Sequence, residues 1–248
     1  MGNKPISISV IMPAYNEEGN FERVALHNIK TFEFKNLDFE VLIVDDGSTD
    51  RTGEIAEDIA KRYASVSCYH HEKNMGAGAA FYTGIKHSSK DYVIFAPFDN
   101  PLDPEDLDAY LSRMGICDIV VGVRVERVGY SLFARLASFT YNRILVPLMF
   151  NIGISDVNWI QVYRRNLFTS GILKFNLSSR IFFFAEILVR ARREQLIIVE
   201  VPSKMRRRIH GKPTVIRFSI IFGILRDMLS FFWEIRKNDK TNQRKIKR

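Results

Sequence analysis

Short β-branched runs alternate with helical patterns through the first half of this 248-residue chain, and this alternation limits the possible folds more than any other feature. The stretches between the runs are amphipathic and open with acids or polar capping residues, as in STDRTGEIAEDIAKRY. Strands that alternate with helices favour a parallel, doubly wound sheet. The predicted strands are ISVIM (8–12), EVLIV (40–44), SVSCY (65–69), YVIFA (92–96), DIVVG (118–122) and, late in the chain, IIVEVP (197–202). We therefore predict an α/β fold, a mostly parallel sheet with helices on both faces.

Polar, turn-forming sequence follows four of these runs: PAYNEE, DDGSTD, HHEKNMGAG and PFDNPLD. In parallel sheets, ligands collect at the carboxyl ends of the strands, so we expect these segments to form one site. Asp45 and Asp46 could accept hydrogen bonds from a nucleobase N–H and a ribose hydroxyl, with Gly47 permitting the turn. The alternative for this loop is a helix cap with no ligand. We interpret His70 and His71 as loop residues rather than metal ligands.

A helix is predicted to begin within NMGAGAAFYTG (74–84). The third glycine of a dinucleotide-binding motif is missing, and the segment follows the third strand instead of the first. Small residues around Gly76 would instead let the start of this helix approach a nucleotide phosphate or ribose.

Basic residues exceed acidic ones by 36 to 28, and the net charge of +8 is concentrated in KMRRR (204–208) and the tail KNDKTNQRKIKR (237–248). This distribution suits a polyanion or an anionic membrane surface, and a solvated tail is the alternative. Nucleic acid is disfavoured because acidic strand ends would repel a phosphate backbone. Cys68 and Cys117 lack metal-ligand spacing, which indicates small core residues in a reducing compartment.

Two stretches in the second half, 129–153 and 214–236, are helical in pattern, very apolar and rich in aromatic residues. Charged residues interrupt them too often for a span across a bilayer, but the pattern suits the membrane interface. These interruptions are Arg135, Arg143, Arg226 and Asp227. The alternative is packing in the core or between copies of the chain, which would make a homo-oligomer. We predict a domain over 1–212, an amphipathic helix over 213–236 and a basic tail over 237–248.

PAYNEE (13–18), VDDGSTD (44–50), the NxGxGxA stretch (74–80) and one acid after the fourth strand occur in an order that resembles the family 2 inverting glycosyltransferases. The subgroup that the chain most resembles is that of dolichyl-phosphate mannose synthase and bacterial polyprenyl-phosphate sugar transferases. EVPSKMRRRIHGK (200–212) is similar to the basic stretch that closes their catalytic domain. The resemblance implies a GT-A fold, a nucleotide-sugar donor, a polyprenyl- or dolichyl-phosphate acceptor, and a peripheral place on the cytoplasmic face of a membrane.

Carried over position by position, the resemblance also implies roles for individual residues. The residues that would contact the nucleotide are Pro13, Tyr15, Glu17, Asp45, Asp46 and Gly76. Asp99 would be the second acid of the family's DXD motif, a ligand to Mg²⁺ or Mn²⁺ at the diphosphate. Pro97 replaces the first acid of that motif, and Pro101 stands two residues beyond Asp99.

The replacement by Pro97 has three explanations, which we rank in order. Asp99, phosphate oxygens and water could hold the metal, since Mg²⁺ usually keeps several waters. Arg124, Arg208 and Lys212 could instead neutralise the leaving diphosphate. Third, the protein could have lost catalysis and bind only a nucleotide sugar or a lipid phosphate.

Asp156 begins DVNWIQVYRRNLF, where the family often has an acid followed by Gly-Phe-Arg. It could position the acceptor or act as a base, and a structural cap is the alternative. A phosphate acceptor is already ionised at neutral pH and needs no strong base. The sequence thus predicts an enzyme that transfers a sugar from UDP or GDP to a polyprenyl phosphate with inversion, with a non-catalytic binding protein as the second hypothesis.

Overall fold

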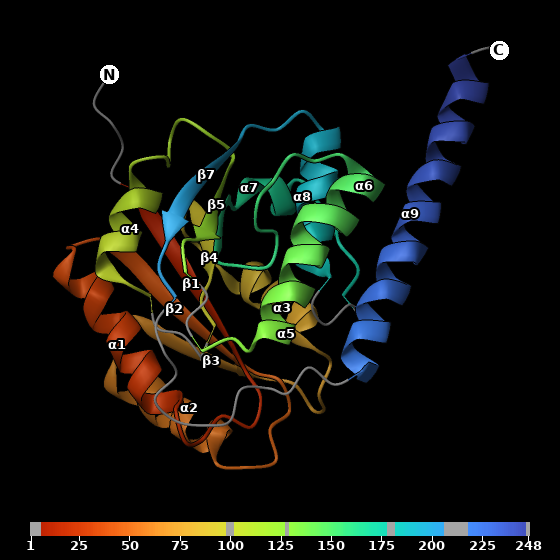
Figure 1. Ribbon diagram of the computed structural model, residues 1–248. Helices are drawn as coiled ribbons and strands as arrows, with labels where there is room; N and C mark the ends of the chain where they lie inside the picture. Colours follow the sequence, from red (N-terminus) through yellow and green to blue (C-terminus); the bar gives the residue numbers. More distant parts are fainter. Residues whose placement is uncertain (1–5, 98–101, 127–128, 178–181, 206–217, 247–248) are drawn as a thin grey trace, which may run out of the picture.

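One seven-stranded sheet organises the computed structural model, which describes residues 6–97, 102–126, 129–177, 182–205 and 218–246 (Figure 1). The strand order across the sheet is β3-β2-β1-β4-β6-β5-β7. Paired strands are parallel, except that β6 runs antiparallel to β4 and β5. The strands are β1 (Ser7–Ala14), β2 (Asp38–Asp45), β3 (Val66–His70), β4 (Tyr92–Phe95), β5 (Ile119–Arg124), β6 (Gln161–Arg164) and β7 (Ile198–Ser203).

Strand β6 is the one strand of this sheet that the sequence does not predict. It has four residues, and both of its faces are covered, with Val162 in one core and Tyr163 in the other. A short strand buried on both faces shows no alternation of apolar and polar residues. The six predicted strands are confirmed.

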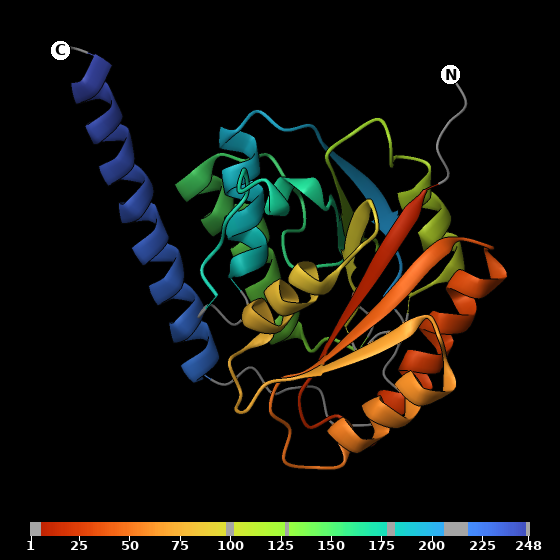
Figure 2. The same cartoon turned by 180° about the vertical axis from the view of Figure 1, so that it is seen from behind.

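Helices cover both faces of the sheet, as predicted (Figures 1 and 2). Successive β1 residues face opposite sides: Val10 and Met12 join the core under α1, α2 and α4, whereas Ile11 joins the core under α3, α8 and α9. The helices are α1 (Phe21–Phe34), α2 (Thr52–Arg62), α3 (Ala77–His87), α4 (Pro104–Leu111), α5 (Leu132–Phe139), α6 (Val146–Phe150), α7 (Asn166–Thr169), α8 (Phe183–Arg193) and α9 (Phe218–Ile246), with the π-helix η1 (Thr140–Leu145) between α5 and α6.

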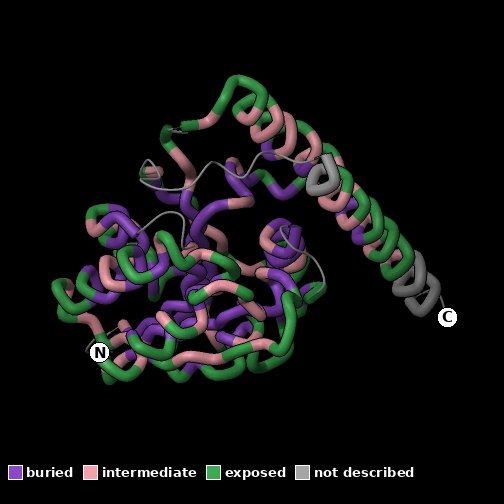
Figure 3. The backbone as a smooth tube through the Cα atoms, turned by 90° about the horizontal axis from the view of Figure 1, so that it is seen from below, coloured by how far each residue is buried: buried purple, intermediate pink, exposed green. Residues whose placement is uncertain are grey.

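The two apolar helical stretches differ in detail from the prediction. The stretch 129–153 forms α5, η1 and α6 in succession, and α9 continues to Ile246, so much of the expected basic tail is helical. No glycine or proline interrupts residues 224–246, and Lys, Arg and Gln are compatible with a helix. Figure 3 shows α9 extending past the body of the domain, and residues 236–238 on this part of the helix are exposed. Within the residues described, no helix combines the length and apolar character needed to cross a membrane.

Aromatic packing and an ion pair hold α9 against the body. Met228 and Phe231 are buried, and the Phe231 ring centroid lies 5.5 Å from that of Phe150. Arg190 of α8 donates to Glu234 of α9 at 2.9 Å. The opposite side of α9 leaves Phe222, Leu229 and Trp233 exposed. Helix α9 therefore has one apolar face against the protein and a second that the described part of the chain does not cover.

Candidate active site

The loops after β1 and β2 meet at the carboxyl edge of the sheet and are joined by hydrogen bonds. Asp46 N–H donates to Ala14 C=O at 2.8 Å, and Glu17 N–H donates to Thr52 Oγ1 at 2.8 Å. Asn16 receives the Thr49 N–H at 2.8 Å through its side-chain oxygen. These contacts bring the predicted Pro13–Glu17 and Asp45–Asp46 segments to one edge, as the parallel sheet requires.

The Asp46 carboxylate joins this edge to the loop after β3. It accepts from Met75 N–H at 2.9 Å and from Gly76 N–H at 2.7 Å, and His71 Nδ1 lies 2.7 Å from Oδ1. His71 Nε2 in turn lies 2.9 Å from Thr83 Oγ1 on α3. Asp46 is only 3% exposed, so its carboxylate mainly organises the loop that leads into α3.

The carboxylate of Asp45, the residue before Asp46, is also bonded to neighbouring groups of the protein. Its carboxylate accepts from Ser48 N–H at 3.1 Å and lies 3.1 Å from His70 Nδ1. The parallel register places Asp45 directly opposite His70 on β3. A Cβ atom at Gly53 would lie 2.9 Å from Asp45 Oδ2, so this position favours glycine.

His70 and His71 are thus the functional-edge residues that sequence reasoning passed over. Two consecutive histidines lie at the end of β3, opposite the two consecutive aspartates at the end of β2, and this pairing was the available signal.

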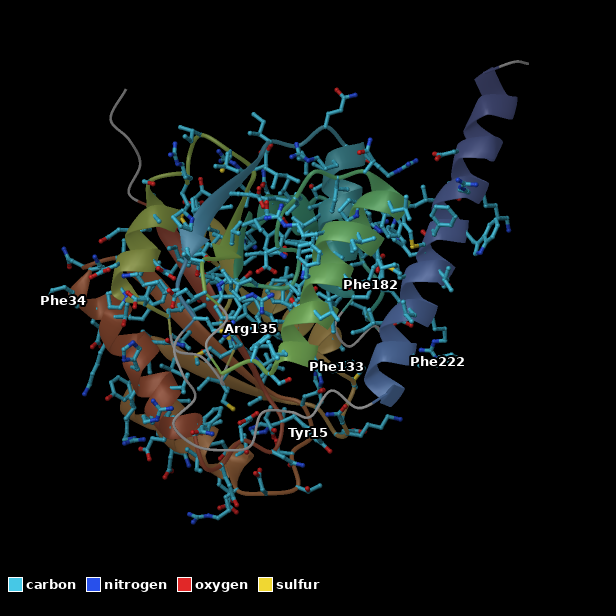
Figure 4. The ribbon with its side chains drawn as sticks, in the orientation of Figure 1. Tyr15, Phe34, Phe133, Arg135, Phe182 and Phe222 are labelled. Carbon is cyan, nitrogen blue, oxygen red and sulfur yellow. The ribbon has the colours of Figure 1, made fainter. Side chains whose placement is uncertain are left out.

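The remaining predicted nucleotide contacts also lie on this edge. Tyr15 is 44% exposed and lies toward the lower end of the molecule in Figure 4, whereas Pro13 and Glu17 are partly buried. Gly76 precedes α3 with φ at +96°, a backbone conformation that L side chains rarely adopt. The structure therefore brings together all six residues of the predicted nucleotide set; their contacts with a nucleotide stay a prediction.

Arg124 and Asp156, predicted separately, form one buried ion pair. Arg124 Nε and Nη2 donate to the two Asp156 carboxylate oxygens, each at 2.7 Å, and the side chains are 5% and 0% exposed. Arg124 Nη1 donates to Tyr130 OH at 2.9 Å, and the guanidinium lies 4.9 Å from the Trp159 ring. Burial alone would lower the pKa of Arg124, but the Asp156 hydrogen bonds and charge raise it above its ordinary value.

Three predicted residues, Asp99, Arg208 and Lys212, lie outside the described residues, so the predicted metal ligand and two of the predicted cations are not placed. Among the residues that are described, no group of three or more His, Cys, Asp or Glu side chains is arranged to hold a metal ion. Asp45 and Asp46 are engaged by the donors named above and do not form an open metal site. These side chains alone therefore do not fit a divalent ion.

The fold and this edge define an α/β protein of the GT-A type, with polar loops gathered where the parallel strands end. The chain matches the sequence model of Glycosyl transferase family 2 over residues 9–229 and belongs to that family. This confirms the resemblance inferred from the motifs.

Curated relatives are similar over most of this chain. It is 27% identical to glycosyltransferase AglD of Haloferax volcanii over 248 residues, covering 96% of this chain and 39% of the relative. It is 27% identical to the undecaprenyl-phosphate 4-deoxy-4-formamido-L-arabinose transferase of Edwardsiella ictaluri over 208 residues, 83% of this chain and 62% of the relative. It is 29% identical to the dolichyl-phosphate beta-glucosyltransferase ALG5D of Trichomonas vaginalis over 219 residues, 80% and 66%. The chain thus spans between about two fifths and two thirds of these relatives.

Solved structures share the fold at low sequence identity. Glucosyl-3-phosphoglycerate synthase from Mycobacterium tuberculosis, in complex with Mn²⁺, UDP and phosphoglyceric acid, superposes with a TM-score of 0.68 at 20% identity, covering 92% of this chain and 78% of that one. Staphylococcus aureus TarS 1–349 gives a TM-score of 0.58 at 20% identity, covering 79% and 58%. These similarities support the GT-A fold and carry no information on substrates.

Proposed function

We propose that this protein transfers a sugar from a UDP- or GDP-sugar to a polyprenyl or dolichyl phosphate, with inversion, at a membrane surface. The observation that carries the proposal is membership of Glycosyl transferase family 2 together with two relatives named for lipid-phosphate acceptors, undecaprenyl phosphate and dolichyl phosphate. The basic surplus of the chain suits both an anionic acceptor and an anionic membrane.

In the proposed reaction, an oxygen of the acceptor phosphate attacks the anomeric carbon of the donor sugar. The bond from that carbon to the diphosphate oxygen breaks, the nucleoside diphosphate leaves, and the configuration at the carbon inverts. An ionised phosphate needs no strong base. This requirement agrees with Asp156, which is fully buried against Arg124 and is better placed to orient that guanidinium than to accept a proton.

Donor binding is assigned to the edge at the ends of β1 and β2 and to the start of α3. We propose that Asp45 and Asp46 act there mainly by fixing the loops. The Asp45 carboxylate accepts a hydrogen bond from Ser48 N–H, and the Asp46 carboxylate accepts hydrogen bonds from Met75 and Gly76 N–H. Tyr15, which is exposed at the same edge, would contact the nucleoside directly.

A divalent ion, Mg²⁺ or Mn²⁺, belongs to the proposal because structures of the same fold contain Mn²⁺ or Mg²⁺ with UDP. When bound, it would supply positive charge to the leaving diphosphate. Asp99 is the residue that we propose to hold it, with Arg208 and Lys212 as further cations at the phosphates.

The acceptor's hydrocarbon tail stays in a bilayer, so we propose that the protein lies on the membrane surface. Helix α5 supports this location because Leu132, Phe133, Leu136 and Phe139 are each more than half exposed. Figure 4 shows Phe133 and Phe222, at the starts of α5 and α9, toward the same end of the molecule as Tyr15. Lys and Arg residues near anionic headgroups would each add about 1 kcal/mol of attraction. Cys68 and Cys117 are free thiols, which agrees with a location on the cytoplasmic side, where the environment is reducing.

Release of nucleoside diphosphate, measured with and without a polyprenyl phosphate, tests the proposed function. We expect release from a UDP- or GDP-sugar to depend on the acceptor. Binding of the nucleotide sugar with no acceptor-dependent release would instead support the non-catalytic hypothesis.

A further inference from the structure

The exposed helical segment formed by α5, η1 and α6 has few fully buried side chains. Helix α5 has no buried residue, η1 has one, Asn142, and α6 has one, Val146. Asn142 is 1% exposed, which is unusual for an amide on a helix whose outer face is apolar. A buried amide is costly unless its polar atoms are hydrogen-bonded, so the partners of Asn142 decide its role.

Both polar atoms of the Asn142 side chain are used. Its Nδ2 donates to Ser138 C=O one turn earlier at 2.8 Å, and its Oδ1 accepts the N–H of Val157 at 2.9 Å. The second bond leaves the helix and reaches the residue next to Asp156. π-Helical turns are rare and frequently occur at functional sites, and here the π-helix carries the amide that makes this contact.

A residue just before this helical segment contacts the Arg124–Asp156 pair from the arginine side. Tyr130, which precedes α5, accepts from Arg124 Nη1 at 2.9 Å. The pair is therefore connected to one exposed helix through Tyr130 on the arginine side and through Asn142 and Val157 on the aspartate side. Trp159, which follows in the same loop, stacks against the guanidinium.

We propose that Asn142 is a positioning residue: its bond to Val157 N–H sets the loop that carries Asp156, and Asp156 in turn sets the direction of the Arg124 guanidinium. The inference rests on the proposed function and on the role predicted for Arg124 in it, neutralisation of the leaving diphosphate. The Asn142 amide lies on the helix that is proposed to face the membrane and does not touch the Arg124–Asp156 pair directly. It would nevertheless determine the geometry of that buried pair.

Three variants separate this role from simple support of the helix. Asn142→Leu keeps the approximate volume and removes both bonds, whereas Asn142→Asp keeps an oxygen for Val157 N–H. Ser138→Ala is the matched control, because it removes only the hydroxyl that lies 3.3 Å from Asn142 Nδ2. Far-ultraviolet circular dichroism and thermal unfolding report whether each full-length variant is folded.

The kinetic readout is transfer to a short-chain polyprenyl phosphate that dissolves without a membrane. For Asn142→Leu we expect kcat to fall about tenfold or more with the donor KM within about twofold, since misplacing a site by 1 Å can cost about a hundredfold. Asn142→Asp should recover most of kcat, and Ser138→Ala should match wild type. The proposal is overturned if Asn142→Leu retains wild-type kcat, if the aspartate variant is no better, or if the donor KM rises in step.

A second readout does not depend on activity and so distinguishes failure of this inference from failure of the proposed function. The chain has two tryptophans, and in a Trp233→Phe background the emission comes from Trp159 beside Arg124. Adding Asn142→Leu should change that emission, and adding Ser138→Ala should not. An unchanged spectrum for Asn142→Leu overturns the inference even if wild type transfers sugar. A changed spectrum with an inactive wild-type chain overturns the proposed function alone.

Discussion

Breaking the Arg124–Asp156 pair from one side should be among the most destabilising single changes in this domain. Asp156 is 0% exposed and receives two guanidinium bonds of 2.7 Å, so Asp156→Asn removes the charge that compensates a buried arginine. Losing one partner of a buried pair costs about 3–5 kcal/mol. Because asparagine still offers one acceptor oxygen, we expect the free energy of unfolding to fall by about 3 kcal/mol, near the lower end of this range.

Urea denaturation of wild type and Asp156→Asn, followed by circular dichroism, measures this loss as a change in midpoint at constant slope. In thermal unfolding, about 3 kcal/mol corresponds to a fall in Tm of about 6–12 °C for a chain of this size. The matched control is Asp108→Asn, which breaks the pair between Lys35 and Asp108, whose carboxylate is 59% exposed. An exposed pair should cost less than about 1 kcal/mol.

A double variant checks the physical reason for the expected loss. Replacing both members with apolar residues, as in Arg124→Met with Asp156→Leu, leaves no uncompensated charge and should be more stable than Asp156→Asn. The reasoning is refuted if Asp156→Asn costs no more than Asp108→Asn, or if the double variant is less stable than the single one.

Three further predictions follow from other parts of the structure. Asp46→Ala leaves two backbone N–H groups without their acceptor, so it should destabilise the fold by about 1–3 kcal/mol and weaken UDP or GDP binding in calorimetry; unchanged nucleotide affinity would reject its place at the donor edge. Burial raises the pKa of Glu186 above its ordinary value despite the hydrogen bonds from Arg190. Glu186 therefore contributes its full share to the free energy of unfolding when the pH is below the ordinary pKa of a glutamate. This contribution is lost as the pH rises through the raised pKa of the folded state. Relative to Glu186→Gln, the wild-type free energy of unfolding should therefore decline as pH rises across this window, and parallel pH profiles would contradict it. Wild type should float with anionic liposomes at low and high salt, and replacing Phe222, Leu229 and Trp233 with serine should abolish flotation at high salt; a wild-type chain that stays at the bottom at both salt concentrations would contradict the membrane location.

Local pattern was sufficient for most of the fold. The β-branched runs at 8–12 and 40–44 are strands because apolar side chains alternate between two helical layers. The same parallel order predicts that the loops after β1 and β2 share an edge, and Ala14 does lie opposite Asp45. Features that follow from strand order and hydrophobic periodicity could therefore be predicted.

Pairings across long sequence separations could not be read from the chain. Arg124 and Asp156 are 32 residues apart, and their ion pair depends on how β5 and the loop before β6 meet. The π-helix has no local signal either, because TYNRIL reads as ordinary helix, and the Asn142 partner Val157 lies 15 residues away in the sequence. The histidine partners of Asp45 and Asp46 likewise required the register of β2 and β3.

Detection of the lipid product tests the central claim most directly. The full-length chain is incubated with a UDP- or GDP-sugar, Mg²⁺ or Mn²⁺, and a polyprenyl phosphate, and the lipid fraction is analysed by mass spectrometry and by NMR of the anomeric proton. We expect one hexose or related sugar on the lipid phosphate, with the anomeric configuration opposite to that of the donor, and a sharp loss of product with Asp99→Asn. The account would be contradicted if a folded wild-type chain formed no polyprenyl-phosphate sugar with any of these donors. It would also be contradicted if the product kept the anomeric configuration of the donor.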